Sequence, residues 1–531
     1  MMDYVKVLIA GGGVVLSLLW LRRCQDKSSC GSRVEETSLS LVPFCIALAV
    51  MLLGCGLAMR VFTGSHTGTV GNAVKCILAY LLLVLLLVKF TSRRLFAILF
   101  IMAVVSLLHI CVLKITHSNY VQVMYSDFNG PQECILNPNM SAWHPPRFFY
   151  WCNYECVCSI LGDVVGRSIK VGQVLNVLCC VMAVPPVFII AEKIGGYFMA
   201  WFTALFMGTA PCMLVYSTIL TNEFLAAFLY IYFFFFLQEC LGDVSPKRIL
   251  QNAALAGLCL GLGQLFKPIG IVIACAMFVL LLVNVFCKRK SKAVLWVLTC
   301  SMVYIGALVS SNVGQSCLSE FASPRALKEE CSTGGLARSI IMGLNVGSKG
   351  MWYPESGELL SKPNSELRAL LKEKIKRDYP LYPSLFWEKI IIAYGSPDWL
   401  CWYCWSIPPN YTPSWLNSLM SIWHRAFWLL FLLGMSGGMM SLFLPARKGE
   451  TLSICVLLVG TIVAFTAGLM LVECQSRYKT TLYPFFFLVV PYARIWFAKD
   501  NPFYRFILRK LRKSSKCRRV GWIYDKVKAF T

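Results

Sequence analysis

A carboxylate followed by a histidine and two prolines is the part of this sequence that most indicates chemistry. Asp127 lies just beyond a predicted membrane span, and His144-Pro145-Pro146-Arg147 follows in the same loop. A carboxylate beside an apolar wall is suited to act as a general base, and His144 and Arg147 could bind a phosphate or a sugar hydroxyl. This pattern is expected where an enzyme handles a lipid-borne substrate. The structural alternative is an Asx turn at Asp127 and a rigid helix-starting turn at the prolines.

More charged side chains fall at the ends of predicted spans. Glu223 begins one span, where the alternative is an N-cap with an acid in the first turn. Lys267-Pro268 separates two spans, and its lysine is either a phosphate-binding cation or a snorkelling side chain. Arg477-Tyr478-Lys479 precedes the last span, where two cations suit a lipid phosphate or an interfacial anchor. We expect these residues to gather with Asp127 in one polar cavity at the outer membrane face.

The elements that must position these residues are apolar helices. Of the 531 residues, 57% are hydrophobic and only 14% are charged, with a mean hydropathy of +0.64, whereas soluble domains contain about 25% charged residues. Apolar runs of about 20 residues recur, and each can cross a bilayer core as a helix. The sequence therefore predicts an all-α integral membrane protein with about 13 transmembrane helices, at 4–21, 38–59, 72–90, 95–116, 173–193, 196–216, 222–239, 250–266, 269–286, 294–311, 422–443, 451–471 and 481–498.

Charge sets the orientation of these spans. The net charge is +24, and lysine and arginine concentrate in the loops after the first, third, seventh, ninth and eleventh spans and in the tail, 499–531. All of these fall on one side, which the positive-inside rule assigns to the cytoplasm. The loops 117–172 and 312–421 then lie outside. No basic face with interleaved aromatics occurs outside the tail, which argues against nucleic acid as a partner.

The two outer loops differ in character. The first carries an aromatic stretch from Phe148 to Trp151 that suits an interfacial helix. The second mixes charges of both signs, with a solvent-facing helix predicted over 365–377 and an interfacial belt of Trp399, Trp402, Trp405 and Trp415. The chain divides into three leading helices (1–94), a core (95–311), the second outer loop (312–421), C-terminal helices (422–498) and the basic tail.

Metal and redox chemistry have little support in the sequence. Many of the 25 cysteines lie inside apolar runs, where cysteine behaves as a small hydrophobe. Cys401 and Cys404 are more often loop cysteines or a disulfide than a redox site. We expect no cofactor, although Asp127 with Glu223 could hold a divalent ion. His109, within the fourth span, is more often a packed, hydrogen-bonded histidine than a proton relay.

Several of these segments, in this order, resemble those of the GT-C polytopic glycosyltransferases. The resemblance is greatest to the dolichyl-phosphate-mannose–protein mannosyltransferase and aminoarabinose-transferase branch, and it covers roughly 95–498. The matching segments are Ser126-Asp127-Phe128, His144-Pro145-Pro146, Val215-Tyr216-Ser217 to Thr221-Asn222-Glu223, Leu265-Phe266-Lys267-Pro268, and Glu473 to Tyr478 with Pro484 beyond.

The resemblance implies transfer of a sugar from a polyprenyl-phosphate carrier to an acceptor, which could be a glycolipid, a cell-envelope polymer or a protein. Asp127 would deprotonate the acceptor in an inverting displacement. Lys267 and Arg477 would hold the carrier phosphate, and Glu223 and His144 would line the cavity. A bacterial plasma membrane is the preferred location, while sequons at Asn139 and Asn410 leave a eukaryotic reticulum open.

The chain departs from the family pattern at several points. Phe128 follows Asp127 where protein O-mannosyltransferases carry an Asp-Glu pair, Lys267 stands where arginine is usual, and the three leading helices have no counterpart. The competing function is a transporter or flippase of lipid-linked sugars, which predicts helices broken by Gly or Pro and charges near the bilayer midplane. Charges at one edge favour the enzyme. A structural or regulatory membrane protein would leave Asp127 dispensable.

Overall fold

The computed structural model describes residues 93–117, 129–137, 149–240, 245–287, 290–321, 335–360, 362–394, 450–474 and 480–492. Every regular element in these ranges is a helix, which confirms the all-helical class. Six of the described helices are long and apolar enough to cross a membrane, so the protein is an integral membrane protein. The predicted spans at 4–21, 38–59, 72–90 and 422–443 lie outside the described residues, and both the total of 13 and the domain division stay predictions.

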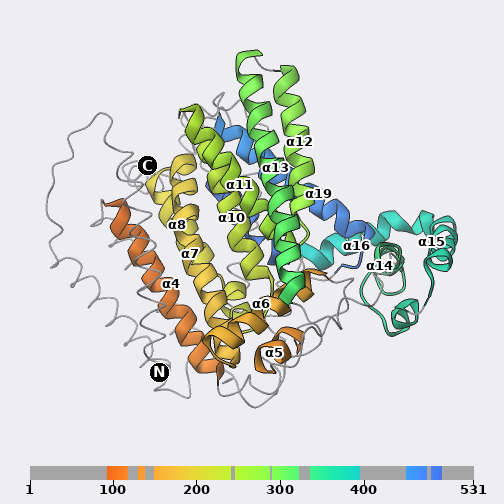
Figure 1. Cartoon of the computed structure of the whole chain (residues 1–531). Coiled ribbons are helices and arrows are strands. Elements are labelled where there is room, and N and C mark those ends of the chain that lie inside the picture. Colours follow the sequence, from red (N-terminus) through yellow and green to blue (C-terminus); the bar gives the residue numbers. More distant parts are fainter. Residues whose placement is uncertain are drawn as a thin grey trace, which may run out of the picture.

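The long helices form one bundle, shown in Figure 1. Near its centre is α7, which is apolar and mostly buried around its circumference, as expected of a helix surrounded by other helices. In Figure 1, α4 runs along one side of α7, and α10 to α13 continue the bundle on the other. The bundle helices are α4 (Arg94–His117), α7 (Ile169–Gly195), α8 (Tyr197–Gly208), α9 (Pro211–Tyr216), α10 (Glu223–Cys240), α11 (Pro246–Phe266), α12 (Gly270–Cys287), α13 (Lys290–Phe321), α19 (Glu450–Leu471) and α20 (Tyr483–Val489).

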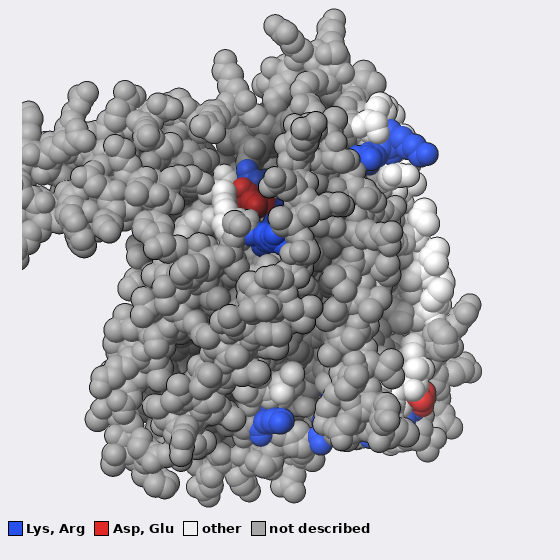
Figure 2. Space-filling model, turned by 90° about the vertical axis from the view of Figure 1, so that its left-hand side faces the viewer, with Lys and Arg blue, Asp and Glu red and all other residues white. Residues whose placement is uncertain are grey.

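Ion pairs mark one end of this bundle. The Arg94 guanidinium at the start of α4 lies 2.8 Å from Glu192 at the end of α7, and the adjacent Lys193 pairs with Glu239 at the end of α10. These three helix ends therefore lie together, as expected if the predicted spans cross the membrane in alternating directions. Figure 2 shows described lysine and arginine side chains toward the upper and lower ends of this side of the molecule.

The predicted span 196–216 is wrong as a single helix. Its residues form two short helices, α8 and α9, separated at Thr209 and Ala210. Pro211 opens α9 and has no N–H with which to continue the hydrogen bonding of α8. The Thr209 hydroxyl instead donates to the carbonyl of Leu205, 2.8 Å away. The hydropathy of the sequence does not predict this break, because the residues on both sides of it are apolar.

Small residues bring α11 and α13 into close contact. Gly257 and Gly261 are four positions apart on α11, a spacing typical of closely packed membrane helices. A Cβ atom at Gly257 would lie 2.6 Å from the carbonyl oxygen of Val303 and 3.0 Å from the Cα of Gly306, both on α13. The backbone of α13 therefore occupies the space that any larger residue at Gly257 would need.

We expect Gly257→Ala to lower the free energy of unfolding by about 1–3 kcal/mol, because the two backbones must separate to admit the methyl group. The matched control is Gly468→Ala on α19, where no atom lies within 4 Å of the added Cβ. That control should be neutral or slightly stabilising, since alanine favours a helix over glycine. Thermal unfolding of the detergent-solubilised variants measures the difference. Equal midpoints for the two would contradict the close packing of α11 on α13.

The other described helices flank the bundle or connect its helices: α5 (Asn129–Leu136), α6 (Phe149–Val165), α14 (Gly335–Gly343), η3 (Pro354–Leu360), α15 (Asn364–Asp378), η4 (Tyr379–Leu381) and α16 (Tyr382–Tyr394). The charged helix predicted over 365–377 is confirmed by α15. The aromatic helix of the first loop also forms, as α6. However, Trp151 and Tyr154 are buried, and α6 packs on α7, α11 and α13. These two aromatic side chains therefore pack inside the protein. The amphipathic pattern of the sequence does not show whether such residues face the protein or the membrane interface.

Candidate functional site

Two of the predicted site residues, Glu223 and Lys267, lie in the part of the chain that the structure describes. They meet although they are 44 positions apart: Lys267 Nζ donates to Glu223 Oε1 over 2.7 Å. Each side chain is only 16% exposed. The predicted residues outside the described ranges are Asp127, His144, Arg147, Arg477, Tyr478 and Lys479.

Local sequence explains why this pair forms. Glu223 is the first residue of α10, where the helix dipole favours a carboxylate. Lys267 ends α11 in an extended conformation, with φ −151° and ψ 116°, as expected for a residue that precedes proline. Both termini lie at the end of the bundle opposite to the Arg94–Glu192 pair, because α10 and α11 run in opposite directions. The two residues therefore lie together at one end of the described bundle, and their placement at the outer membrane face stays a prediction.

Side chains from three other positions cap the end of α11. The last carbonyls of a helix have no partner within it, and here Asn153 Nδ2 donates to the Leu265 carbonyl over 2.9 Å. Asn222 Nδ2 donates to the Phe266 carbonyl over 2.7 Å, and the Tyr230 hydroxyl donates to the Lys267 carbonyl. These bonds hold the Lys267 backbone firmly. Sequence reasoning missed all three capping residues, since nothing in their spacing indicates contact with 265–267.

The junction that leads into Glu223 is held in a similar way from α4 and α7. His109 is fully buried, and its Nδ1 lies 2.9 Å from the Ser217 hydroxyl. Gln173 Nε2 donates to the Thr218 carbonyl and Asn176 Nδ2 to the Ile219 carbonyl, each over 2.7 Å. The interpretation of His109 as a packed, hydrogen-bonded residue is confirmed. The 217–222 turn is thus positioned by buried polar side chains of the bundle.

The pair retains unused hydrogen-bonding capacity. Within the described residues, Glu223 Oε2, Asn222 Oδ1 and the Thr221 hydroxyl are buried without a hydrogen-bond partner. Buried polar atoms are nearly always satisfied by protein, water or ligand. The Lys267 ammonium also lies 5.8 Å from the centre of the Tyr150 ring, within the range of a cation–π contact. Acceptors, a cation and an aromatic ring therefore meet at this junction, which suits a ligand that carries hydroxyl groups and a negative charge.

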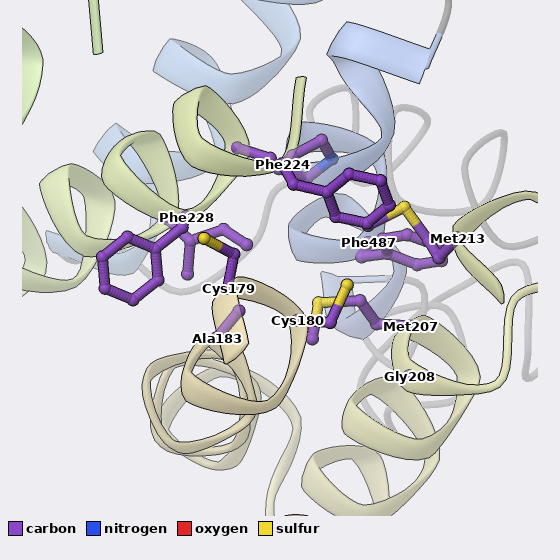
Figure 3. A pocket seen from close by; sticks show the side chains of 12 residues that line it. Cys179, Cys180, Ala183, Met207, Gly208, Met213, Phe224, Phe228 and Phe487 are labelled. Carbon is purple, nitrogen blue, oxygen red and sulfur yellow. The ribbon is translucent and has the colours of Figure 1, made fainter. Parts of the chain in front are cut away.

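An apolar pocket begins one residue further along α10. On this helix it is lined by Phe224, Ala227, Phe228 and Ile231, whose spacing places them on one helix face. Figure 3 shows the sulfur-bearing and aromatic side chains that surround the same space. The pocket and the ion pair thus share the first turn of α10. The other lining residues are Cys179, Cys180 and Ala183 of α7, Met207 and Gly208 of α8, Met213 of α9, and Pro484 and Phe487 of α20.

The described residues contain no group of three or more His, Cys, Asp and Glu that could hold a metal ion. The cysteines in these ranges are free thiols, and those lining the pocket, Cys179 and Cys180, are buried. Cys401 and Cys404 lie outside the described residues. A divalent ion held by Asp127 with Glu223 stays a prediction, since only Glu223 is described.

The sequence matches no known family model and no curated protein. The structure is similar to the oligosaccharyltransferase of Archaeoglobus fulgidus in its apo form, with 14% identity, a TM-score of 0.42, and 76% of this chain and 50% of that chain covered. The same enzyme in complex with an inhibitory peptide and a dolichol-phosphate gives 14% identity, a TM-score of 0.41, and coverage of 83% and 52%. This chain therefore spans about half the length of the archaeal enzyme.

The structure is also similar to ArnT from Cupriavidus metallidurans bound to undecaprenyl phosphate, with 14% identity, a TM-score of 0.33, and 70% of this chain and 76% of that chain covered. Both neighbours are GT-C glycosyltransferases, the class that the sequence motifs resemble. Similarity at these TM-scores assigns no function to this chain. The described residues define an integral membrane protein built of helices, with a mostly buried ion pair beside an apolar pocket.

Proposed function

We propose that this protein is a membrane glycosyltransferase that moves a sugar from a polyprenyl-phosphate carrier to an acceptor. The observation that carries this proposal is the Glu223–Lys267 pair at the first turn of α10, beside buried acceptor atoms that have no partner among the described residues. A polyprenyl-phosphate sugar carries hydroxyls, then a phosphate, then an apolar chain. The junction offers acceptors for the hydroxyls and a cation for the phosphate, and the apolar chain would lie in the bilayer against the outside of the bundle.

The roles within the pair follow from their hydrogen-bonding groups. A lysine ammonium has three N–H donors, and Glu223 Oε1 accepts from one of them. The others are available to a phosphate oxygen, while Glu223 Oε2 and Asn222 Oδ1 accept from sugar hydroxyls. Glu223 also lowers the electrostatic cost of keeping Lys267 charged while the site is empty. Lys267 would therefore be held ready for the carrier phosphate.

The reaction would be an inverting displacement. Asp127 takes the proton of the acceptor hydroxyl or amine, whose oxygen or nitrogen bonds to the anomeric carbon. The bond from that carbon to the phosphate oxygen breaks, and the polyprenyl phosphate leaves with the electron pair. Lys267 and Arg477 stabilise the charge that develops on the leaving group. Substrate contacts by His144, Arg147, Tyr478 and Lys479 belong to the same proposal, which requires no cofactor.

The acceptor is a glycolipid, a cell-envelope polymer or a protein at the extracytoplasmic face, and the preferred location is a bacterial plasma membrane. The basic loops support this orientation, since their charges mark the opposite, cytoplasmic side. Membrane lipids surround the bundle as further partners.

The competing function is transport of a lipid-linked sugar. One observation favours it: α7 contains Pro185 and Pro186 in its interior, and α8 and α9 are separated by a break. Interrupted helices are typical of transporters. The described charged pairs, however, lie at helix ends and not midway along the bundle, which favours the transferase.

The test is reconstitution of the full-length protein into liposomes with radiolabelled polyprenyl-phosphate sugars and candidate acceptors. We expect label to appear in the acceptor, with release of polyprenyl phosphate. Protein-free liposomes control for spontaneous transfer. Movement of the labelled lipid across the bilayer without any transfer would assign a flippase and contradict the transferase.

A further inference from the structure

Helix α16 is apolar on both of its sides. Leu385 and Ala393 are buried against the rest of the protein, while Trp387, Ile390 and Ile391 on the other side are exposed. The exposed fractions of Trp387 and Ile391 are 64% and 50%. A helix with large apolar residues on two sides needs an apolar environment on both of them, and protein supplies only one of them here.

Of the two charged side chains of α16, Glu388 is partly exposed, at 44%, and Lys389 is held inside the protein. Glu388 lies 3.8 Å from Lys349, and Lys389 is fully buried. The Lys389 ammonium donates to three backbone carbonyls: Gly343 at 3.0 Å, Met470 at 2.8 Å and Val472 at 2.6 Å. Although burial lowers the pKa of Lys389 to about 8, the amine is still mostly protonated at pH 7.

These carbonyls belong to two helix ends. Gly343 is the last residue of α14, and Met470 and Val472 flank the last residue of α19. Carbonyls at helix C-termini lack partners in the helix and carry the negative end of its dipole, so a cation is the side chain best suited to bind them. Lys389 therefore fastens α16 to the C-terminal ends of α14 and α19 at once.

The surrounding chain fits closely around this lysine. A Cβ atom at Gly350 would lie 2.9 Å from Lys389 Cε. The Cys474 N–H donates to the Gly350 carbonyl over 2.8 Å, and the Cys474 thiol contacts the Lys389 carbonyl at 3.7 Å. The position of α16 relative to the end of α19 is thus set by several independent contacts.

The helix end that Lys389 binds is also the end of a candidate membrane span. Helix α19 is one of the candidate spans, and its apolar surface remains exposed at Val463 and at Leu471, its last residue. Helix α16, with its exposed apolar residues, contacts α19 at this end. In Figure 1, α16 lies beside the end of α19 and across the direction of α10 to α13, which is the orientation of a helix in the plane of the membrane.

We propose that α16 is a membrane-surface helix, whose Trp387, Ile390 and Ile391 enter the lipid interface at the C-terminal end of α19 while Lys389 holds it there. Tryptophan favours the membrane–water interface, and an apolar helix face buried at the headgroup level is typical of in-plane helices. Most charged side chains of α15, in contrast, are exposed. This role depends on the membrane placement of α19 and not on sugar transfer, so the two proposals can fail separately.

The test places the photo-crosslinking residue p-benzoylphenylalanine at Ile391 of the full-length protein in lipid nanodiscs. The matched control is the same residue at Ile375 on α15, an isoleucine of similar exposure, 42%, that lies among charged residues. After illumination, mass spectrometry measures lipid adducts at each position. We expect at least about fivefold more lipid adducts at Ile391 than at Ile375, because only the former would lie in the interface.

Equal lipid labelling at the two positions would overturn the proposal, and crosslinks from Ile391 to a second copy of the chain would assign this face to a protein interface instead. A second variant tests the anchor. Lys389→Met keeps the length of the side chain but removes its donors, and it should lower lipid labelling from Ile391 severalfold. Unchanged labelling would overturn the role of Lys389.

Discussion

Removing either charge of the Glu223–Lys267 pair is expected to destabilise the protein severely. In Lys267→Met the Glu223 carboxylate stays mostly buried without a counter-charge, and in Glu223→Gln the Lys267 ammonium does. Leaving one member of a buried pair alone typically costs about 3–5 kcal/mol, which is a large part of the stability of most proteins. Thermal unfolding in detergent measures the loss. The matched control is the exposed pair Lys362–Glu366, where Lys362→Met should cost less than about 1 kcal/mol.

The double variant separates structure from function. Glu223→Gln combined with Lys267→Met leaves no uncompensated charge, so we expect it to recover most of the lost stability. Sugar transfer should remain absent, because the neutral pair offers neither a cation to the phosphate nor a carboxylate to the hydroxyls. If the double variant regained transfer together with stability, the pair would be a structural element only, and the proposed substrate site would have to lie elsewhere.

Asp127→Asn is expected to reduce transfer about 10²–10⁴-fold, the usual contribution of a general base. The amide is similar in size but cannot take a proton from the acceptor. The affinity for the lipid donor should change little, since the proposed role of Asp127 is toward the acceptor. The measurement is the rate of label transfer in liposomes at saturating donor.

The matched control for Asp127→Asn is Asp163→Asn. Asp163 lies on α6, is largely exposed and pairs with Arg167. The same chemical change there should leave transfer unchanged. Full transfer by Asp127→Asn would refute the proposed base. If Asp127→Asn lost transfer because it no longer folds, its thermal unfolding curve would show this. The variant Asp127→Glu, which keeps the carboxylate, would then test the proposed base, and partial recovery of transfer would support it.

The sequence could predict that Glu223 and Lys267 lie near each other, because both residues lie at ends of predicted spans on the same side of the membrane. Counting spans is enough to place two such residues at one membrane face. The distance of 2.7 Å between Lys267 Nζ and Glu223 Oε1 could not be predicted in this way. It depends on α10 and α11 being neighbours in the bundle, and on Asn222 and Tyr230 capping the end of α11.

The sequence by itself determined the class of protein and the approximate positions of the described spans. The physical reason is that hydrocarbon excludes charges and unpaired backbone groups, so membrane spans are legible as long apolar runs. Only the tertiary structure decided which way apolar residues face, since Trp151 and Tyr154 pack into the bundle. It also showed that Pro211 divides a predicted span into two helices. It also decided that Lys389, one of many lysines in an outer loop by sequence, binds two helix ends. Such contacts join distant segments, and no local pattern of residue types encodes them.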